Sequence, residues 1–297
     1  TLPIAKSYIA QNRVKPAALS YLGPVFRQRA EGPAEFEQAG LELLAQPDPD
    51  VALDQVFDFI SQAFLIFAIA SPSVQLGSVE LFETLLSAAD MPEVWRPRVQ
   101  RRFGNKQALN ALLDRLTNPH AGINGQNAAS RDELITSIKG QMLEDGLSLI
   151  EGRSPEEIAD RFLEKQALAA ARVPKKTIEL LRAYLAISGP VENALQEIQA
   201  LLAAAEIAAT SNIEKCRSHA RALSERLPGA TIDFDAGFSP RLHYYTGLVF
   251  EISASNNQVL ASGGQYDRLL QSLGASRQIP ASGCALWVER LAAEAAT

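Results

Sequence analysis

Cysteine and histidine are scarce in this sequence, and their scarcity excludes several kinds of site. The 297 residues include two cysteines, Cys216 and Cys284, and three histidines, His120, His219 and His243. The cysteines lie in unlike contexts, a polar helical stretch and an apolar strand, and the histidines lack ligand spacing. We therefore expect no disulfide framework, no metal cluster and no cofactor. A reducing cytoplasm is the default location.

The sequence also lacks an excess of positive charge and a long apolar run. Lysine and arginine total 28 against 34 acidic residues, a net charge of −6. Non-specific nucleic-acid binding needs clustered cations, so this balance opposes it, although a local basic groove stays open. The most apolar run, 56–70, contains Asp58 and Gln62 and is too short to span a bilayer. With no visible signal peptide, we expect neither nucleic acid nor a membrane as a partner.

What is present is enough apolar sequence to bury a sizeable interior. Hydrophobic residues make up 47% of the chain, and the mean hydropathy is −0.03. A chain of 297 residues is long for a single core, so one large or two smaller domains are expected. The sequence begins at Thr1 rather than methionine, and we expect that residues precede it.

Two stretches near the start predict an antiparallel hairpin. After a short amphipathic helix within 1–14, strands are expected at 19–28 and 35–44, joined by a polar Gly-Pro turn. On the second strand Gln38, Gly40 and Glu42 share a face, with about 13 Å between the outer two α-carbons. An amide and a carboxylate over a glycine could hold the two ends of a ligand the size of an amino acid. An ordinary solvated strand face is the alternative.

A stretch near the other end of the chain, 241–252, is aromatic and alternates, which predicts a strand. Tyr245, Gly247 and Glu251 would point to one side, and Tyr244 and Phe250 to the other. The first face places a ring hydroxyl beside a glycine, as a floor for a small polar ligand would. Packing alone is the alternative reading of the paired tyrosines.

Between these two regions the patterns are almost wholly helical. A helix capped by 47–50 is expected to run to Ala70, followed by a strand at 73–78 and a helix at 79–89. Helices are expected to fill 92–227, one of them starting with a capping box at 154–157, and 118–127 is expected to be the most mobile loop. Strands at 231–235, 258–262 and 281–286 follow. We therefore expect a core of 1–90 and 228–297 and a helical insertion of 91–227.

Taken in this order, the segments resemble the catalytic domain of histidyl-tRNA synthetase and its paralogues. The resemblance is carried by Tyr244–Glu251 and Gly263–Asp267, which look like the two histidine-specific signatures of that family, and by two class II motifs. Phe26-Arg27 with 35–42 looks like motif 2, and 283–290 looks like motif 3. The resemblance covers about the first 90 and last 70 residues. It implies an α+β fold, a class II aminoacyl-tRNA synthetase-like antiparallel sheet flanked by helices; motif 1 is absent.

The resemblance also implies roles for individual residues. Gln38 would contact the amino-acid head of a bound histidine, Glu42 would engage its imidazole, and Tyr245 with Tyr244 would line the imidazole end. Thr1 looks like the threonine that binds the α-amino group. The paired glycines of the second signature complete the histidine-binding set, which is Thr1, Gln38, Glu42, Tyr244, Tyr245, Gly263 and Gly264.

The residues that would surround a bound nucleotide depart from the synthetase pattern. Pro240 stands where synthetases carry an arginine, and Arg241 comes one residue late, which in a strand would point it to the other face. Loss of such a cation would typically remove several kcal/mol of transition-state stabilisation. The motif 2 loop is shortened, and Trp287 replaces a small residue of motif 3 and would crowd the nucleotide floor. Arg27 and Arg290 remain as vestigial or structural residues, and no catalytic residue is expected.

A histidine pocket beside a dismantled nucleotide site resembles the regulatory-subunit family of short-form ATP phosphoribosyltransferase. The resemblance implies a subunit that performs no chemistry, forms a homodimer within a hetero-octamer, activates the short catalytic subunit and senses histidine for feedback inhibition. Two alternatives stay open: a histidyl-tRNA synthetase catalytic-domain fragment, and another pseudo-synthetase module that binds a different ligand or acts as a scaffold.

Overall fold

The computed structural model describes residues 1–11, 15–26, 34–117, 130–144, 152–240 and 244–295. They divide into two compact units, one made of 1–88, 103–106 and the residues from 181 onward, the other of 89–102 and 107–180. The expected helical insertion of 91–227 is therefore shared between the units. Its last part, from 181, belongs with the sheet, because a short strand in this part forms one edge of the sheet, one helix packs against that edge, and a second helix packs against the first.

Within the described residues, eight strands form a single sheet that belongs to the first unit. In spatial order they are β1 (Ala17–Phe26), β2 (Glu35–Leu44), β8 (Ala281–Trp287), β7 (Val259–Gln265), β6 (Leu248–Ser253), β3 (Ser73–Ser78), β5 (Thr231–Asp235) and β4 (Ser188–Pro190). All neighbours are antiparallel except β3 and β5, which are parallel. The expected α+β class and the β1–β2 hairpin are confirmed.

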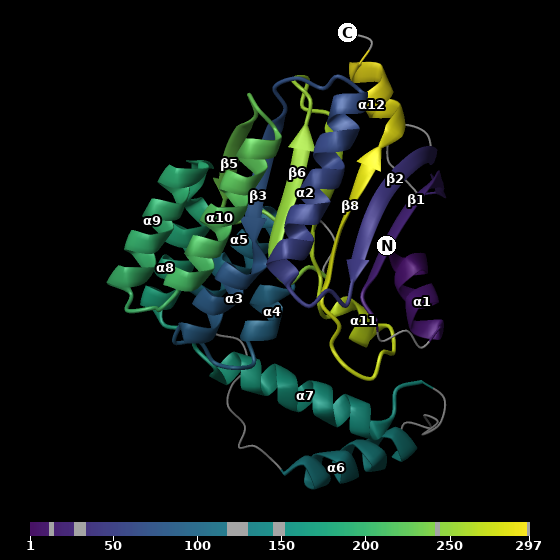
Figure 1. The fold of residues 1–297 in the computed structure, drawn as a ribbon. Coiled ribbons are helices and arrows are strands. Elements are labelled where there is room, and N and C mark those ends of the chain that lie inside the picture. The colour runs from purple at the N-terminus through teal and green to yellow at the C-terminus, as the bar shows by residue number, and fades with distance from the viewer. Residues whose placement is uncertain (12–14, 27–33, 118–129, 145–151, 241–243, 296–297) are drawn as a thin grey trace. The chain divides into compact units, whose positions relative to one another are not determined.

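Helix α2 (Pro49–Ile66) covers one face of the sheet and carries much of the core (Figure 1). The Asp48 side chain caps it by accepting hydrogen bonds from the nitrogens of Asp50 and Val51, as the sequence predicts. The Phe57 ring packs edge-on against Phe250 of β6, with centroids 5.4 Å apart. The helix ends at Ile66 rather than at residue 70, and the backbone turns to a positive φ two residues later.

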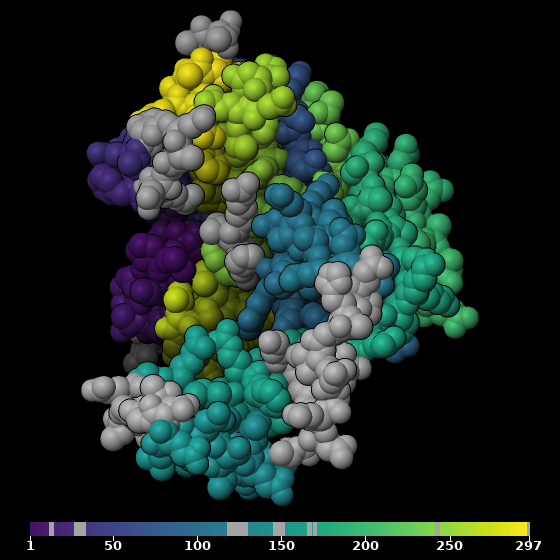
Figure 2. Space-filling model, turned by 180° about the vertical axis from the view of Figure 1, so that it is seen from behind, coloured from purple at the N-terminus to yellow at the C-terminus, as the bar shows by residue number. Residues whose placement is uncertain are grey.

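The remaining helices of the first unit surround the sheet. α9 (Val191–Ala204) packs against β5 and β4, and α10 (Thr210–Arg226) packs against α9 and α2. α3 (Val79–Ala88) follows β3 directly, and α12 (Val288–Glu294) follows β8 (Figure 1). α1 (Leu2–Ala10) lies next to the segment of α11 (Leu269–Ser272), as the purple and olive surfaces in Figure 2 show. No helix in the described part of the chain is long and apolar enough to cross a membrane.

The second unit is helical. It contains α4 (Arg96–Gln100), most of α5 (Lys106–Thr117), α6 (Arg131–Glu144), α7 (Pro155–Ala170) and the first half of α8 (Lys175–Ala186). The predicted capping box at the start of α7 is confirmed: the Glu157 nitrogen donates to Ser154 Oγ at 3.1 Å, and the Ser154 nitrogen donates to Glu157 Oε2 at 3.2 Å. The loop expected at 118–127 lies outside the described residues.

The strand expected at 241–252 is shorter than the sequence suggests. β6 begins at Leu248, residues 244–247 belong to no strand, and 241–243 lie outside the described residues. The reason is β6's partner: β3 ends at Ser78, opposite Leu248, and α3 starts at the next residue. The expected alternation of Tyr244 and Tyr245 to opposite faces is therefore wrong, and their rings lie together with centroids 4.8 Å apart.

Candidate functional site

The register of the central strands builds a recessed floor on the face of the sheet opposite α2. Gly40 of β2 pairs with Ala285 of β8, Ala285 with Ser262 of β7, and Ser262 with Glu251 of β6. Paired residues project their side chains to the same side of a sheet. The first three residues of this row have small side chains or none, and only Glu251 has a long one. The row therefore leaves room above the middle of the sheet.

A pocket of about 310 Å³ lies over this floor. Its described lining consists of residues from β2, β6, β7 and β8, the segments around them and the first residue of the chain: Thr1, Gln38, Pro240, Tyr244, Tyr245, Glu251, Ser262, Tyr266, Gly283, Cys284, Ala285 and Trp287. We call this the tyrosine pocket. It brings together four of the seven residues predicted to bind histidine, namely Thr1, Gln38, Tyr244 and Tyr245.

Gln38 and Glu42 share the pocket face of β2, as the period of two predicts. Gln38 is 3% exposed and Glu42 is 1% exposed, so a solvated strand face is excluded. The gap expected over Gly40 does not exist, because the Tyr21 ring of β1 lies there, and a Cβ at position 40 would overlap it. Gln38 Nε2 donates a hydrogen bond to the Tyr21 hydroxyl at 2.6 Å, which fixes the amide.

The Glu42 carboxylate is not itself part of the pocket lining; it lies against a lining residue, in the space beside the Gly283 α-carbon. Its Oε2 accepts a hydrogen bond from the Tyr266 hydroxyl. Its Oε1 forms an ion pair with the Thr1 nitrogen at 3.2 Å and accepts no hydrogen bond from the other described residues. A buried carboxylate needs donors on both oxygens, so Oε1 can accept a hydrogen bond from an incoming N–H group.

Three tyrosines form the side of the pocket. The ring of Tyr266 lies edge-on to Tyr244 and to Tyr245, with centroids 5.5 and 6.3 Å apart. Burial, reinforced by neighbouring tyrosines and the Glu42 charge, raises the pKa values of Tyr245 and Tyr266 well above 10. Both hydroxyls therefore stay protonated at neutral pH, and Tyr266 donates its single hydroxyl proton to Glu42.

The structure places the predicted glycine pair within the sheet. Gly263 faces the α2 side, where a Cβ would meet the Phe250 ring and the β8 backbone. Gly264 pairs with Gly283 on the pocket side, but a Cβ there would overlap the β6 backbone at Leu248. Both positions need glycine for close packing of strands, and neither lines the tyrosine pocket.

The residues assigned to a vestigial nucleotide site have separate positions. Trp287 lines the end of the pocket beside Gln38, its neighbour in register. The Arg290 guanidinium lies 5.1 Å from the centroid of the Trp287 ring and donates to the Val259 carbonyl at 2.7 Å. Arg290 is therefore half-buried and engaged by these two contacts, and Arg27 lies outside the described residues.

Sequence reasoning did not assign a binding role to three of the lining residues, Tyr266, Glu251 and Ser262, nor to Tyr21, which is hydrogen-bonded to the lining residue Gln38. Tyr266 belongs to the second signature, so its motif offered a signal. Tyr21 becomes visible only with the hairpin register, which sets it opposite Gly40. Burial raises the pKa of the Glu251 carboxyl, which its place in an aromatic alternating stretch did not suggest.

Comparison with known families places the chain among synthetase-like proteins. The family model described as histidyl-tRNA synthetase matches residues 1–144 and 157–291. A curated protein of Mesorhizobium japonicum, named ATP phosphoribosyltransferase regulatory subunit, is 39% identical over 303 residues, covering 99% of this chain and 81% of that protein. A protein of Brucella canis with the same name is 38% identical over 306 residues, with the same coverage of both chains.

Solved structures show the same fold. An ATP phosphoribosyltransferase regulatory subunit/histidyl-tRNA synthetase from Bacillus halodurans matches with a TM-score of 0.61 and 20% identity, covering 100% of this chain and 63% of that one. Histidyl-tRNA synthetase from Nostoc sp. matches with a TM-score of 0.59 and 15% identity, covering 97% and 57%. The present chain thus spans less than two thirds of either solved chain, and at these identities the likeness concerns the fold alone.

Proposed function

Because the chain belongs to the ATP phosphoribosyltransferase regulatory subunits, within the histidyl-tRNA synthetase family, we propose that its tyrosine pocket binds histidine as a feedback signal. In this proposal the chain carries out no reaction itself. It binds and activates a short catalytic subunit in a hetero-octamer, and histidine in the pocket lowers the activity of that complex. We also propose a cytoplasmic location, in keeping with two buried, unpaired thiols and a biosynthetic role.

The observation that carries the proposal is the buried Glu42 carboxylate, whose Oε1 is paired with the Thr1 nitrogen at 3.2 Å and accepts no hydrogen bond from the other described residues. An imidazole has a ring N–H that can donate a hydrogen bond to such an oxygen, and its aromatic ring can pack against tyrosines. Gln38, held by Tyr21 near the other end of β2, offers an amide to the amino-acid head. The pocket volume of about 310 Å³ suits an amino acid.

The opposite end of the pocket supports a role without nucleotide chemistry. Trp287 lies in the lining there, and the motif 3 arginine, Arg290, is engaged with that ring and a backbone carbonyl. None of the described lining residues is a lysine or an arginine. Phosphoryl and adenylate chemistry depends on cations directed at the phosphates, which favours a sensor over a synthetase.

Feedback regulation of this kind requires a coupling free energy between histidine binding and binding of the catalytic subunit. Histidine must bind one arrangement of the complex better than the other, and the coupling is typically about 1–3 kcal/mol and reciprocal in binding. The catalytic subunit should therefore change the histidine affinity of this chain by the same factor by which histidine changes its affinity for the catalytic subunit.

Calorimetric titration of the purified protein with histidine tests the pocket. Saturable binding is expected for histidine and not for phenylalanine, whose ring has a similar size but no N–H for Glu42. Tyr245→Phe is expected to weaken binding without unfolding the protein. Absence of histidine binding would contradict the proposal.

Two further measurements test the regulatory role. Co-expressed with a short catalytic subunit, the protein should co-elute with it, raise its turnover and make that turnover sensitive to histidine. The protein alone should give no histidine-dependent ATP–pyrophosphate exchange. Appreciable exchange would favour the synthetase alternative, and binding to neither partner nor histidine would favour a different pseudo-synthetase module.

A further inference from the structure

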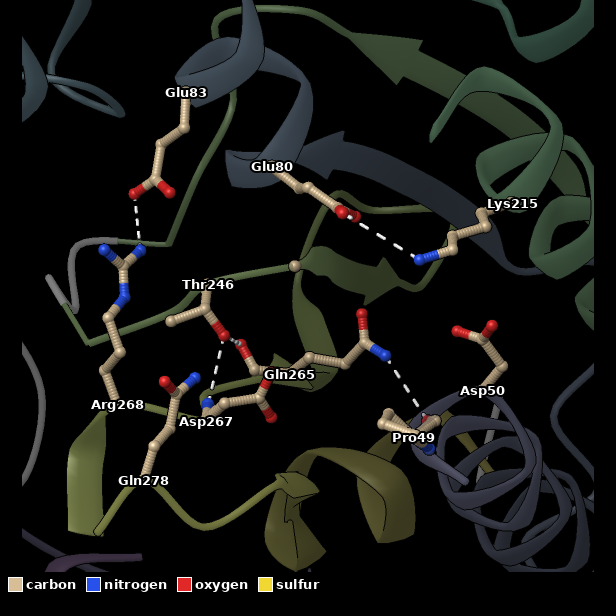
Figure 3. A pocket seen from close by; sticks show the side chains of 11 residues that line it. Pro49, Asp50, Glu80, Glu83, Lys215, Thr246, Gln265, Asp267, Arg268 and Gln278 are labelled. Carbon is tan, nitrogen blue, oxygen red and sulfur yellow. Dashed lines mark hydrogen bonds and ion pairs between the residues drawn. The ribbon is translucent and has the colours of Figure 1, made fainter. Parts of the chain in front are cut away.

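A second pocket lies in the first unit, outside the tyrosine pocket. It has a volume of about 430 Å³ and is lined mostly by charged and polar side chains (Figure 3): Pro49, Asp50, Glu80, Glu83, Lys215, Thr246, Gly247, Gln265, Asp267, Arg268 and Gln278. We call it the charged pocket. At its edges, Arg268 pairs with Glu83 at 2.5 Å and Lys215 with Glu80 at 3.9 Å.

The two pockets share a wall made of two short segments, 244–247 and 265–267. Tyr244, Tyr245 and Tyr266 line the tyrosine pocket. Their immediate neighbours Thr246 and Gln265, together with Asp267, line the charged pocket. The same few residues of backbone therefore present rings to one side and polar groups to the other.

The Gln265 side chain connects this wall to neighbouring elements by hydrogen bonds. Its side chain is 9% exposed. Oε1 accepts a hydrogen bond from the Leu248 nitrogen at 3.0 Å, and Nε2 donates to the Pro49 carbonyl at 3.3 Å. A Cβ at position 247 would overlap the amide, so Gly247 is required for this packing. Gln265 thus links the start of β6 to the start of α2.

Thr246 fastens the two segments to each other. Its nitrogen donates to the Gln265 carbonyl at 2.8 Å, and its hydroxyl accepts from the Asp267 nitrogen at 3.0 Å (Figure 3). These bonds bracket Tyr266, whose hydroxyl donates to Glu42. They also fix the residue that follows Tyr245. Two of the hydrogen bonds that hold the tyrosines in register with Glu42 are therefore made by a residue that lines the charged pocket.

We propose that Thr246 and Gln265 are positioning residues of the tyrosine pocket, so that hydrogen bonding inside the charged pocket sets the affinity for histidine. This inference rests on the proposed function and names the route by which the pocket is regulated. A change that loosens the Thr246–Asp267 bond displaces Tyr245 and Tyr266 together. Couplings of this kind change affinity about 5- to 150-fold.

The test removes the Thr246 hydroxyl without changing the volume of the side chain. Thr246→Val is expected to weaken histidine binding about tenfold in calorimetry, the order expected for one lost hydrogen bond. Thr246→Ser keeps the hydroxyl and is expected to bind like the unmodified protein. Thr177→Val is the matched control: Thr177 is 5% exposed and its hydroxyl donates to the Asp90 carbonyl at 2.9 Å, in the second unit.

A spectroscopic readout separates positioning from a general loss of stability. Three of the six tyrosines lie in the shared wall, so near-ultraviolet circular dichroism without ligand should change in Thr246→Val and recover in Thr246→Ser. Thr177→Val should lower the melting temperature and leave the histidine affinity unchanged. Unchanged affinity in Thr246→Val would overturn the inference and leave the proposed function intact. Failure of the unmodified protein to bind histidine would overturn both.

Discussion

The tyrosine pocket and the charged pocket use the same wall but place their polar groups in opposite environments. In the first, Glu42 is 1% exposed and its partner Tyr266 is 2% exposed. In the second, the side chains of the Lys215–Glu80 pair are 49% and 43% exposed, and those of Arg268–Glu83 are 48% and 26%. Charges in the first pocket have lost water as an alternative partner, whereas those in the second have kept it.

That difference decides how much a single contact contributes. Removing a partner from a buried carboxylate leaves it unsatisfied, which costs about 1–3 kcal/mol or more. An exposed ion pair is typically worth about 0–1 kcal/mol, because water and salt compete for both charges. Changes on the tyrosine side should therefore have large effects, and changes to the exposed charges should have small ones.

The largest effect is expected at Gly40. Gly40→Ala places a Cβ against the Tyr21 ring and the Cys284 carbonyl, neither of which can move freely, so stability should fall by about 3 kcal/mol. Gly140→Ala is the matched control, because nothing lies near that position in α6 and alanine favours a helix by up to about 1 kcal/mol. Urea denaturation measures both; equal effects would contradict the close packing over Gly40.

Glu42→Gln is expected to weaken histidine binding about 30-fold, because the ring N–H loses a charged acceptor. The equivalent change in the charged pocket, Glu80→Gln, should alter the affinity less than about twofold, because its pair with Lys215 is long and exposed. Calorimetry on the two variants compares the pockets directly. An unchanged affinity in Glu42→Gln would remove that residue from the binding site.

Tyr266→Phe should lower the free energy of unfolding by about 1.5 kcal/mol, because the hydroxyl is the described hydrogen-bond donor to Glu42. The effect should shrink when Glu42→Gln is combined with it, since an amide is less unfavourable than an unpaired carboxylate in the same place. Additive effects in this double-mutant cycle, measured by urea denaturation, would show that the two side chains do not act together.

Glu251 gives a prediction that depends on pH. Burial raises the pKa of its carboxyl in the folded protein above the ordinary value of 4.5. Its favourable contribution is therefore complete below that value and is lost as the pH rises through the folded pKa. Glu251→Gln should be more stable than the unmodified protein at pH 7 and lose this advantage near pH 4. Equal differences at both pH values, in urea denaturation, would argue against burial of the charge.

The smallest effect is expected for Arg268→Gln at the rim of the charged pocket. Because the Arg268–Glu83 pair is largely exposed, the free energy of unfolding should change by less than about 0.5 kcal/mol. The change should be smaller still in 0.5 M salt, where exposed pairs are screened. A loss of unfolding free energy above 1 kcal/mol would mean that single contacts in the two pockets contribute more equally to stability than their exposed fractions indicate.

Local rules in the sequence predicted much of this structure. The Asp48 cap, the capping box at 154–157 and the hairpin of β1 and β2 follow from short-range patterns and are confirmed. Asn257, between β6 and β7, has a φ of 63°, a turn conformation that asparagine tolerates better than most residues. The period of two likewise put Gln38 and Glu42 on one face.

Sequence patterns gave the wrong secondary structure where a partner strand distant in the chain decides whether a segment forms a strand. The alternation before Leu248 predicted a strand, but β3 offers no further partner there. Arg27 and Arg241, important in the comparison with synthetases, lie outside the described residues.

The sequence by itself determined which elements form and which side chains share a face of a strand, because those properties depend on neighbours a few residues apart. Only the tertiary structure decided that Tyr21 fills the space over Gly40, that Tyr266 reaches Glu42 from 224 residues away, and that Gly263 serves packing. Strand register and the meeting of separate segments create these contacts, and no local pattern encodes a register between strands so distant in the chain.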